Sequence, residues 1–269
     1  MKLIWSFSSE IGNYYYDIEW IFSIYEASMI RAKQLGHKVN FYGCQKSYEF
    51  LKDEINGDYV DVSGKDFKIT DDLKIYIHTQ EGLDACTIDG DIILHSKVVD
   101  IPNCDAWFDM RETRKDALHP NSRHIIGYLD MIDIFKKYPI KEEIFDEWDP
   151  MNFTSANVGF IKFNNQKMKD KVINTYYKLR DYYLEVIEPA EDLFDRTYPN
   201  DKNGIDPSLV ICQYMIGCLS DHHNYNVYYA KAKGSGFLYK HYYGPLKWYD
   251  STVEEINRII DSKNSKSLL

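Results

Sequence analysis

The chain has 269 residues, a formal net charge of −10, and aromatic residues at 15% of its length, including 23 tyrosines. Its hydrophobic fraction of 44% argues against a disordered protein, and its length allows a substantial core. The acidic balance disfavours nucleic acid as a partner, because phosphate binding needs a concentrated basic face. No stretch reaches the roughly 20 apolar residues that span a bilayer, so no transmembrane segment is expected.

The cysteine pattern favours reduced thiols. The five cysteines are scattered and contain no C-x-x-C pair, which excludes a zinc knuckle and a disulfide framework. The N-terminal apolar run is short and interrupted, unlike a signal peptide. We therefore expect a cytoplasmic protein.

The first hundred residues alternate between strand-like and helix-like patterns. Strands are predicted at 2–7, 38–42, 58–63 and 73–78 and in a segment that ends with 88–94, and helices at 17–35 and 47–55. This β-α-β order predicts an α/β fold with a mainly parallel, twisted sheet flanked by helices.

The second half continues with longer elements. Strands are predicted at 106–110 and 155–163, a loop at 191–206, and helices at 166–187, 207–220 and 251–260. The sequence contains no internal repeat and no long linker, so residues 1–269 are predicted to form a single domain.

Two aspartates stand in the apolar stretch TIDGDIIL, residues 87–94. If this stretch is a strand, Asp89 and Asp91 point to the same side, where their carboxylates repel each other unless a cation lies between them. Mg²⁺ or Mn²⁺ takes such oxygen ligands, and Gly90 leaves room for a ligand beside the backbone. A bare D-x-D triplet also occurs by chance at strand ends, but its position after several β-α units favours a binding site.

The order of these strands, followed by IDGDIIL, resembles the GT-A class of nucleotide-sugar glycosyltransferases. The resemblance implies that Asp89 and Asp91 hold a divalent metal and that Asp89 also contacts the donor ribose. It makes residues 1–110 the nucleotide- and metal-binding half and residues 111–250 the acceptor half with a closing C-terminal loop. In this fold the first β-α turn lies beside the nucleoside, so the stretch containing Trp5, Ser6 and Ser8 is expected to line that pocket.

The stretch HYYGPLKW, residues 241–248, contains H-x-x-G-x-x-K and is similar to the HxxGxxKPW signature of glycosyltransferase family 8. The resemblance implies that His241 is a third metal ligand, and an imidazole favours Mn²⁺ over Mg²⁺. Gly244 and Lys247 would then contact the diphosphate. The family's proline after the lysine is replaced by Trp248. A tyrosine-rich segment with a chance histidine is the structural alternative.

Three further residues are candidates for the catalytic region. Asn157, in SANVGFIK, is similar to the family's N-x-G strand beside the donor sugar, and Gln213 falls near the family's catalytic glutamine. Asp206 stands seven residues before Gln213 instead of beside it, and both Asn157 and Gln213 could be structural. The family's arginine on a helix before D-x-D has no counterpart in HTQEGLDAC, residues 78–86.

The remaining polar motifs are ambiguous. Asp109, Arg111 and Glu112 could line an acceptor pocket or form surface ion pairs, and His222 with His223 fits a solvated loop. The sequence has neither a phosphate loop nor a G-x-G-x-x-G motif.

The sequence thus predicts a metal-dependent glycosyltransferase that uses a nucleotide-diphosphate sugar and a glycan or other hydroxyl acceptor. The family 8 resemblance implies a retaining enzyme with UDP-galactose or UDP-glucose as the donor. An inverting enzyme would need an acceptor-side base such as Asp206, Glu191 or Asp192. A nucleotidyltransferase and a glycan-binding protein without catalysis are the alternatives.

Overall fold

The computed structural model describes residues 1–9, 18–100, 103–113, 123–148, 154–190, 207–230, 239–242 and 249–265. Within them a seven-stranded sheet has the order β3-β2-β1-β4-β7-β6-β8, and a two-stranded sheet joins β5 to β9. The strands are β1 (Lys2–Phe7), β2 (Val39–Gly43), β3 (Tyr59–Asp61), β4 (Ala85–Ile88), β5 (Ile92–Leu94), β6 (Ala106–Thr113), β7 (Thr154–Phe163), β8 (Val227–Tyr229) and β9 (Tyr239–His241).

The large sheet is mainly parallel. Strand β1 pairs in parallel with β2 and β4, β2 with β3, and β6 with β8, whereas β7 is antiparallel to both of its neighbours. Strand β2 is buried at every position and β1 at four of six, which is typical of a sheet covered on both faces. The predicted α/β class is therefore confirmed.

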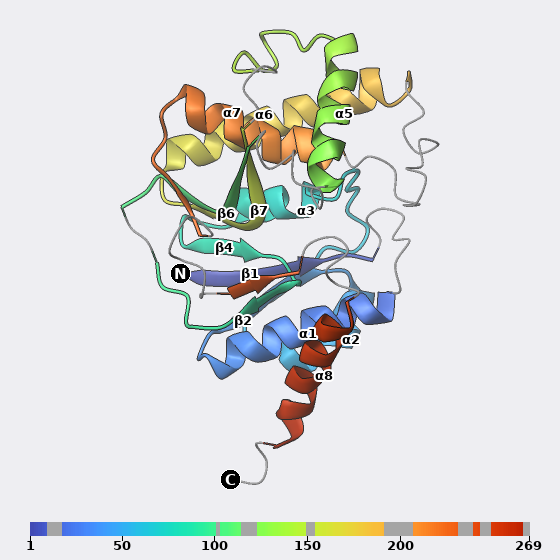
Figure 1. The fold of residues 1–269 in the computed structure, drawn as a ribbon, viewed down its shortest axis with the longest axis vertical. Helices are drawn as coiled ribbons and strands as arrows, with labels where there is room; N and C mark the ends of the chain where they lie inside the picture. Colours follow the sequence, from blue (N-terminus) through green and yellow to red (C-terminus); the bar gives the residue numbers. More distant parts are fainter. Residues whose placement is uncertain are drawn as a thin grey trace.

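Helices cover both faces of the sheet (Figure 1). One layer holds α1 and α8, with α2 nearby, and the other holds α3, α5, α6 and α7. The helices are α1 (Ile18–Gln34), α2 (Gln45–Leu51), α3 (Asp72–Gln80), α5 (Arg123–Lys137), α6 (Gln166–Tyr182), α7 (Met215–His222) and α8 (Asp250–Ser265), with 3₁₀ turn η1 (Lys52–Glu54) and π-helical segments η2 (Tyr183–Ile187) and η3 (Leu209–Tyr214).

The core is divided by the sheet. One large cluster joins α1 and α8 to β1, β2 and β5, and a second joins α5, α6, η3 and α7 to β6 and β7. Gly36 has a φ of +79° and ends α1 in the left-handed conformation that glycine adopts without strain. The chain can then turn directly into β2.

Most predicted elements match the structure, but the predicted strand at 73–78 is wrong because these residues lie in helix α3. Leu73 and Ile77, four residues apart, pack with the sheet, whereas Ile75 joins the cluster built around α6. Burial on two sides of the helix produces an apolar residue at every second position, and that alternation imitates a strand. Sequence reasoning also missed helix α5 and strands β8 and β9.

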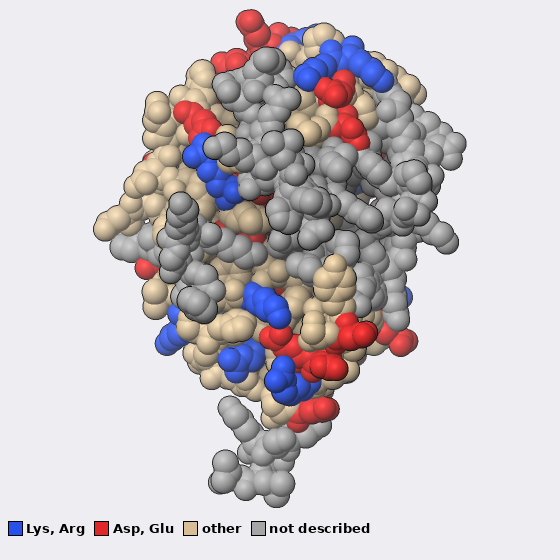
Figure 2. Space-filling view, viewed as in Figure 1, with Lys and Arg blue, Asp and Glu red and all other residues tan. Residues whose placement is uncertain are grey.

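The predicted loop at 191–206 lies outside the described residues. All five cysteines are free, as expected from their spacing. In the described part of the chain, no helix is both long and apolar enough to cross a membrane. Figure 2 shows acidic and basic side chains intermixed on the described part of one face.

Candidate metal and donor site

The two aspartates of the D-x-D motif lie at the carboxyl end of β4. The predicted continuous strand is interrupted there, because β4 ends at Ile88 and β5 begins at Ile92. The Ile92 N–H donates to the carbonyl of Asp89 over 3.1 Å, so the triplet forms a turn. The carboxylates of Asp89 and Asp91 are therefore brought together by a turn and not by strand alternation.

His241 reaches this turn from 150 positions later in the chain. Strand β9 pairs antiparallel with β5, with Ile92 opposite His241, and the N–H of Tyr242 donates to the carbonyl of Asp91 over 2.9 Å. One ligand atom each of Asp89, Asp91 and His241 lies within 4.8 Å of the others. The side chains are 23%, 12% and 4% exposed respectively, so the cluster opens to solvent on the Asp89 side.

Lys74 of α3 is a fourth member of the cluster. Its Nζ lies 2.7 Å from Asp89 Oδ1 and 3.4 Å from Asp71 Oδ1, and its side chain is 15% exposed. Burial alone would lower the pKa of Lys74, but Asp89 and Asp71 raise it well above the ordinary value. An internal cation therefore already offsets part of the negative charge.

The pKa values of Asp89 and His241 are shifted by burial and by the charged groups close to them. Burial raises the pKa of Asp89 to about 6, with Asp91 adding to the rise and Lys74 and His241 opposing it. Burial would lower the pKa of His241, but Asp91 and Asp109 raise it to about 9. These carboxylates accordingly need positive charge nearby, which a divalent cation would supply.

His241 is enclosed on its other side by β6 and β7. Its Nδ1 lies 2.5 Å from Asp109 Oδ2, and the hydroxyl of Tyr239 donates to the other oxygen of the same carboxylate. A Cβ on Gly159 would lie 2.8 Å from the Cε1 of His241. The imidazole of His241 therefore fits here only because position 159 has no side chain.

Gly90 fits closely under an aromatic ring. A Cβ at this position would lie 2.2 Å from the ring of Tyr25. The hydroxyl of Tyr25 donates to the carbonyl of Ser6 over 3.0 Å, which ties α1 to the end of β1 above the D-x-D turn. Gly90 is thus required by this packing, besides any contact with a ligand.

The residues proposed for the nucleoside pocket differ in their environments. Trp5 is completely buried, and its indole N–H donates to the hydroxyl of Ser28, which in turn donates to the carbonyl of Ile92. This environment is that of a core residue and argues against direct contact with a nucleoside. Ser6 is half-buried, and Ser8 is buried at the carboxyl end of β1.

A small polar cluster surrounds Cys44 near Ser8, at the ends of β1 and β2. The Cys44 sulfur lies 3.4 Å from the hydroxyl of Ser9 and 3.2 Å from that of Ser47. Burial would raise the pKa of Cys44, but hydrogen bonds from Ser47, Ser9 and Ser8 lower it to about 7. Together these residues place polar atoms at the edge where the sequence predicts a nucleoside.

Asn157 and Gln213 lie on neighbouring elements. The Asn157 side chain accepts the Gly159 N–H over 3.0 Å, next to the glycine that packs on His241. Gln213 is half-buried on η3, which packs against β7, and its catalytic role stays a prediction. Three predicted site residues, Asp206, Gly244 and Lys247, lie outside the described residues.

The ambiguous residues of FDMRET separate into two groups. Arg111 forms a surface ion pair with Asp221 at 3.0 Å. In contrast, Asp109 and Glu112 are buried, and Glu112 accepts a hydrogen bond from the hydroxyl of Ser155. Further away, His223 lies 2.6 Å from the buried carboxylate of Glu147, so it is more than a solvated loop residue.

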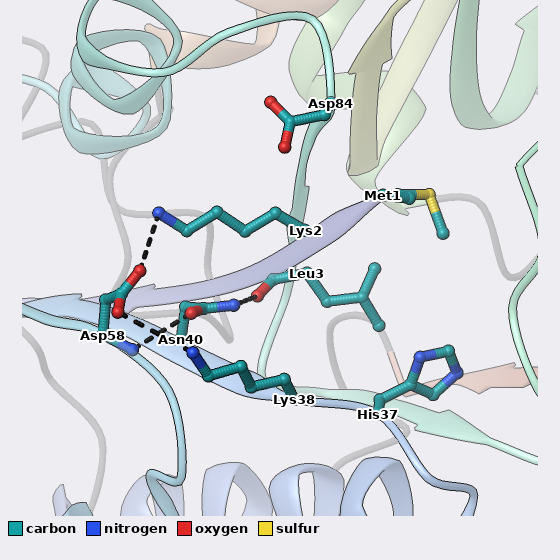
Figure 3. Close-up of a pocket in the computed structure, with 8 residues that line it drawn as sticks. All are labelled: Met1, Lys2, Leu3, His37, Lys38, Asn40, Asp58 and Asp84. Carbon is teal, nitrogen blue, oxygen red and sulfur yellow. Dashed lines mark hydrogen bonds and ion pairs between the residues drawn. The ribbon is translucent and has the colours of Figure 1, made fainter.

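A cavity of about 240 Å³ opens at the opposite edge of the sheet, beside the starts of β1 and β2 (Figure 3). Its polar side chains largely satisfy one another. Lys2 Nζ lies 3.2 Å from Asp58, and the Asn40 amide donates to the carbonyl of Leu3. Because this cavity lies at the amino-terminal edge of the parallel strands, it is separate from the D-x-D cluster at their carboxyl edge.

Sequence reasoning missed Lys74 and left Asp109 undecided. Residues 78–86 contain no lysine or arginine, and Lys74 stands before them on helix α3, for which the sequence pattern predicts a strand. The usable signal is an aspartate and a lysine three positions apart, Asp71 and Lys74, where the lysine stands among the apolar residues Leu73, Ile75 and Ile77. For Asp109, the signal that could have found its role is the position of an aspartate inside the apolar strand AWFDM, because a buried carboxylate needs a partner.

No protein-family model matches the chain, and no curated protein matches it. Similar solved structures include a galactosyltransferase, LgtC, in complex with donor and acceptor sugar analogues, at 12% identity and a TM-score of 0.49, covering 97% of this chain and 96% of that chain. Glycosyltransferase GlyE of Streptococcus pneumoniae has 13% identity and a TM-score of 0.44, covering 99% of this chain and 64% of that chain. Mouse xyloside xylosyltransferase 1 has 11% identity and a TM-score of 0.39, covering 85% and 84%.

These structures are glycosyltransferases, the class that the sequence motifs resemble. At such identities and scores the likeness alone assigns no activity to this chain. The chemistry available to this chain is set by the side chains gathered at the carboxyl edge of the sheet.

Proposed function

We propose that the chain is a metal-dependent glycosyltransferase that transfers a sugar from a nucleoside diphosphate to a hydroxyl acceptor. The observation that carries the proposal is the convergence of Asp89, Asp91 and His241 at the carboxyl end of β4. Two of these residues lie in one turn, and the third comes from a distant strand. Such edges of α/β sheets are where ligands gather.

The residues present suit a divalent cation. Two carboxylates and one imidazole form a mixed oxygen and nitrogen donor set, which favours Mn²⁺ over Mg²⁺. The partial exposure of Asp89 leaves a side from which a diphosphate could enter. When bound, the cation would supply positive charge to the leaving diphosphate.

The protein's own groups supply the rest of the mechanism. Asp91 and His241 would hold the cation, and Asp89 would share it while contacting the ribose. Lys74 offers a second, permanently charged group beside Asp89, where it can orient that carboxylate and face the donor. Asn157, Gln213 and Asp206 are the residues that we assign to the sugar and acceptor side, and Gly244 and Lys247 those that would contact the diphosphate.

The donor class follows from the resemblance to glycosyltransferase family 8. We propose UDP-galactose or UDP-glucose as the donor and transfer with retention of configuration. The acceptor is a glycan or another hydroxyl compound.

The test is a thermal-shift series with UDP, GDP, CMP and UDP-sugars, each with and without Mn²⁺ or Mg²⁺. A ligand at about 100 times its Kd stabilises the native state by roughly 2.7 kcal/mol. For a chain of this size that amounts to a Tm rise of roughly 5 to 10 °C. We expect this rise with UDP only when Mn²⁺ is present, followed by transfer from the matching UDP-sugar.

Two variants should abolish the shift, Asp91→Ala and His241→Ala. Asp84→Ala is the matched control, because Asp84 precedes the same strand, β4, but lies at the opposite edge, beside the cavity of Figure 3. A metal-dependent shift without turnover of any UDP-sugar would favour a glycan-binding protein. The donor site is refuted if no nucleotide shifts the Tm under either metal condition.

A further inference from the structure

Asp109 is buried beside the proposed metal ligands without belonging to them. It is 0% exposed and stands on β6 where the pairing with β7 is irregular, between Phe108 and Met110. Such irregularities re-aim side chains out of the regular ladder. The carboxylate of Asp109 thereby contacts side chains of strand β9.

One carboxylate contacts both inward-facing side chains of β9. Tyr239 and His241 are two positions apart and share a face, whereas Lys240 between them is exposed. The hydroxyl of Tyr239 donates to Asp109 Oδ1, and His241 Nδ1 lies 2.5 Å from Asp109 Oδ2. Asp109 thus fixes the imidazole from one side while its Nε2 lies 3.2 Å from Asp91.

We propose that Asp109 is a positioning residue that holds His241 with its proton on Nδ1 and its Nε2 directed at the metal. The inference rests on the proposed function and adds a residue to the same site. A carboxylate that accepts the Nδ1 proton selects the tautomer in which Nε2 has the lone pair that a metal needs. Gly159 leaves space for the ring, and Tyr239 holds the carboxylate in place.

The experiment compares Mn²⁺ binding by the wild-type chain and by Asp109→Asn, measured by titration calorimetry without any sugar donor. The asparagine keeps the shape, but its NH₂ group can donate to Nδ1 and favour the wrong tautomer. We expect Mn²⁺ affinity to fall about 10- to 100-fold. At a pH above its pKa of about 9, where the His241 ring is neutral, its nitrogen-15 shifts, assigned by comparison with His241→Gln, should show the proton moving from Nδ1 to Nε2.

Asp72→Asn is the matched control. Asp72 is also a buried aspartate that accepts a tyrosine hydroxyl, from Tyr176 over 2.8 Å, but it contacts none of the three proposed ligands. This variant should bind Mn²⁺ as the wild type does, whatever its stability. Equal losses in both variants would show a general effect of destabilisation and overturn the inference.

A second variant keeps the test open if Asp109→Asn does not fold. Tyr239→Phe retains the ring that packs edge-on against Phe160 at 4.7 Å and removes only the hydroxyl. We expect about a fivefold loss of Mn²⁺ affinity, as for one missing hydrogen bond. If the wild type binds Mn²⁺ and the folded variants bind it with the same affinity, the proposed role of Asp109 is wrong but the metal site is supported. A wild type that does not bind Mn²⁺ overturns both.

Discussion

Replacing Lys74 by methionine tests whether the acidic cluster depends on positive charge. The substitution keeps the length of the side chain and removes the charge 2.7 Å from Asp89. At an effective dielectric constant of 20, that pair attracts by about 6 kcal/mol. Part of this attraction offsets the cost of burying the lysine, and breaking a buried pair typically costs about 3 to 5 kcal/mol. For a chain of this size, the Tm should fall by roughly 6 to 20 °C in EDTA.

Saturating Mn²⁺ should reverse much of this loss. The cation would replace the missing positive charge beside Asp89, so the Tm deficit of Lys74→Met should be clearly smaller with Mn²⁺ than with EDTA. Because Lys74 competes with the metal for Asp89, the variant should bind Mn²⁺ at least as tightly as the wild type. Differential scanning calorimetry under both conditions measures the deficit.

Lys33→Met provides the matched control. Lys33 of α1 pairs with the buried carboxylate of Glu54 at 2.8 Å, away from the proposed metal site. Its Tm deficit should be the same with and without Mn²⁺. If Lys74→Met shows no deficit in EDTA, or one that Mn²⁺ leaves unchanged, Lys74 does not compensate the D-x-D cluster.

Two further predictions concern packing and pH. Gly159→Ala should lower the free energy of unfolding, measured in urea, by about 1 to 3 kcal/mol and weaken Mn²⁺ binding, because the new Cβ would crowd His241. Gly82→Ala is the control, since its Cβ would meet only the tip of the Asp84 side chain at 3.1 Å. That variant should leave Mn²⁺ binding unchanged. At Glu147, burial would raise the pKa, but hydrogen bonds to Asp146, Lys171 and His223 lower it from 4.5 to about 2. The charged form therefore stabilises the fold at neutral pH by about 2 kcal/mol, less than the full shift because its partners are partly exposed. The difference in free energy of unfolding between wild type and Glu147→Gln should reach its full value above pH 4.5 and shrink as the pH falls towards 2. If urea unfolding gives the same difference from pH 3 to pH 7, this reasoning is contradicted.

The sequence alone determined the order and type of most elements. Apolar periodicity located β1, α1 and β2 to within a residue or two, because each lies against one side of a core or is buried along its whole length. The two carboxylates of D-x-D predicted a cation, and the resemblance of H-x-x-G-x-x-K to the signature of glycosyltransferase family 8 added His241 to the same site. Local pattern failed at α3, where burial on two sides of a helix gave the alternation of a strand.

Only the tertiary structure decided how the site is assembled. Asp89 and His241 are 152 positions apart, and they meet because β9 adds to β5 beyond the end of the main sheet. The same long-range packing brings Lys74 to Asp89 and Asp109 to His241. A sequence specifies which side chains are available, but distances between distant positions are set by the sheet order and by the turn at the end of β4.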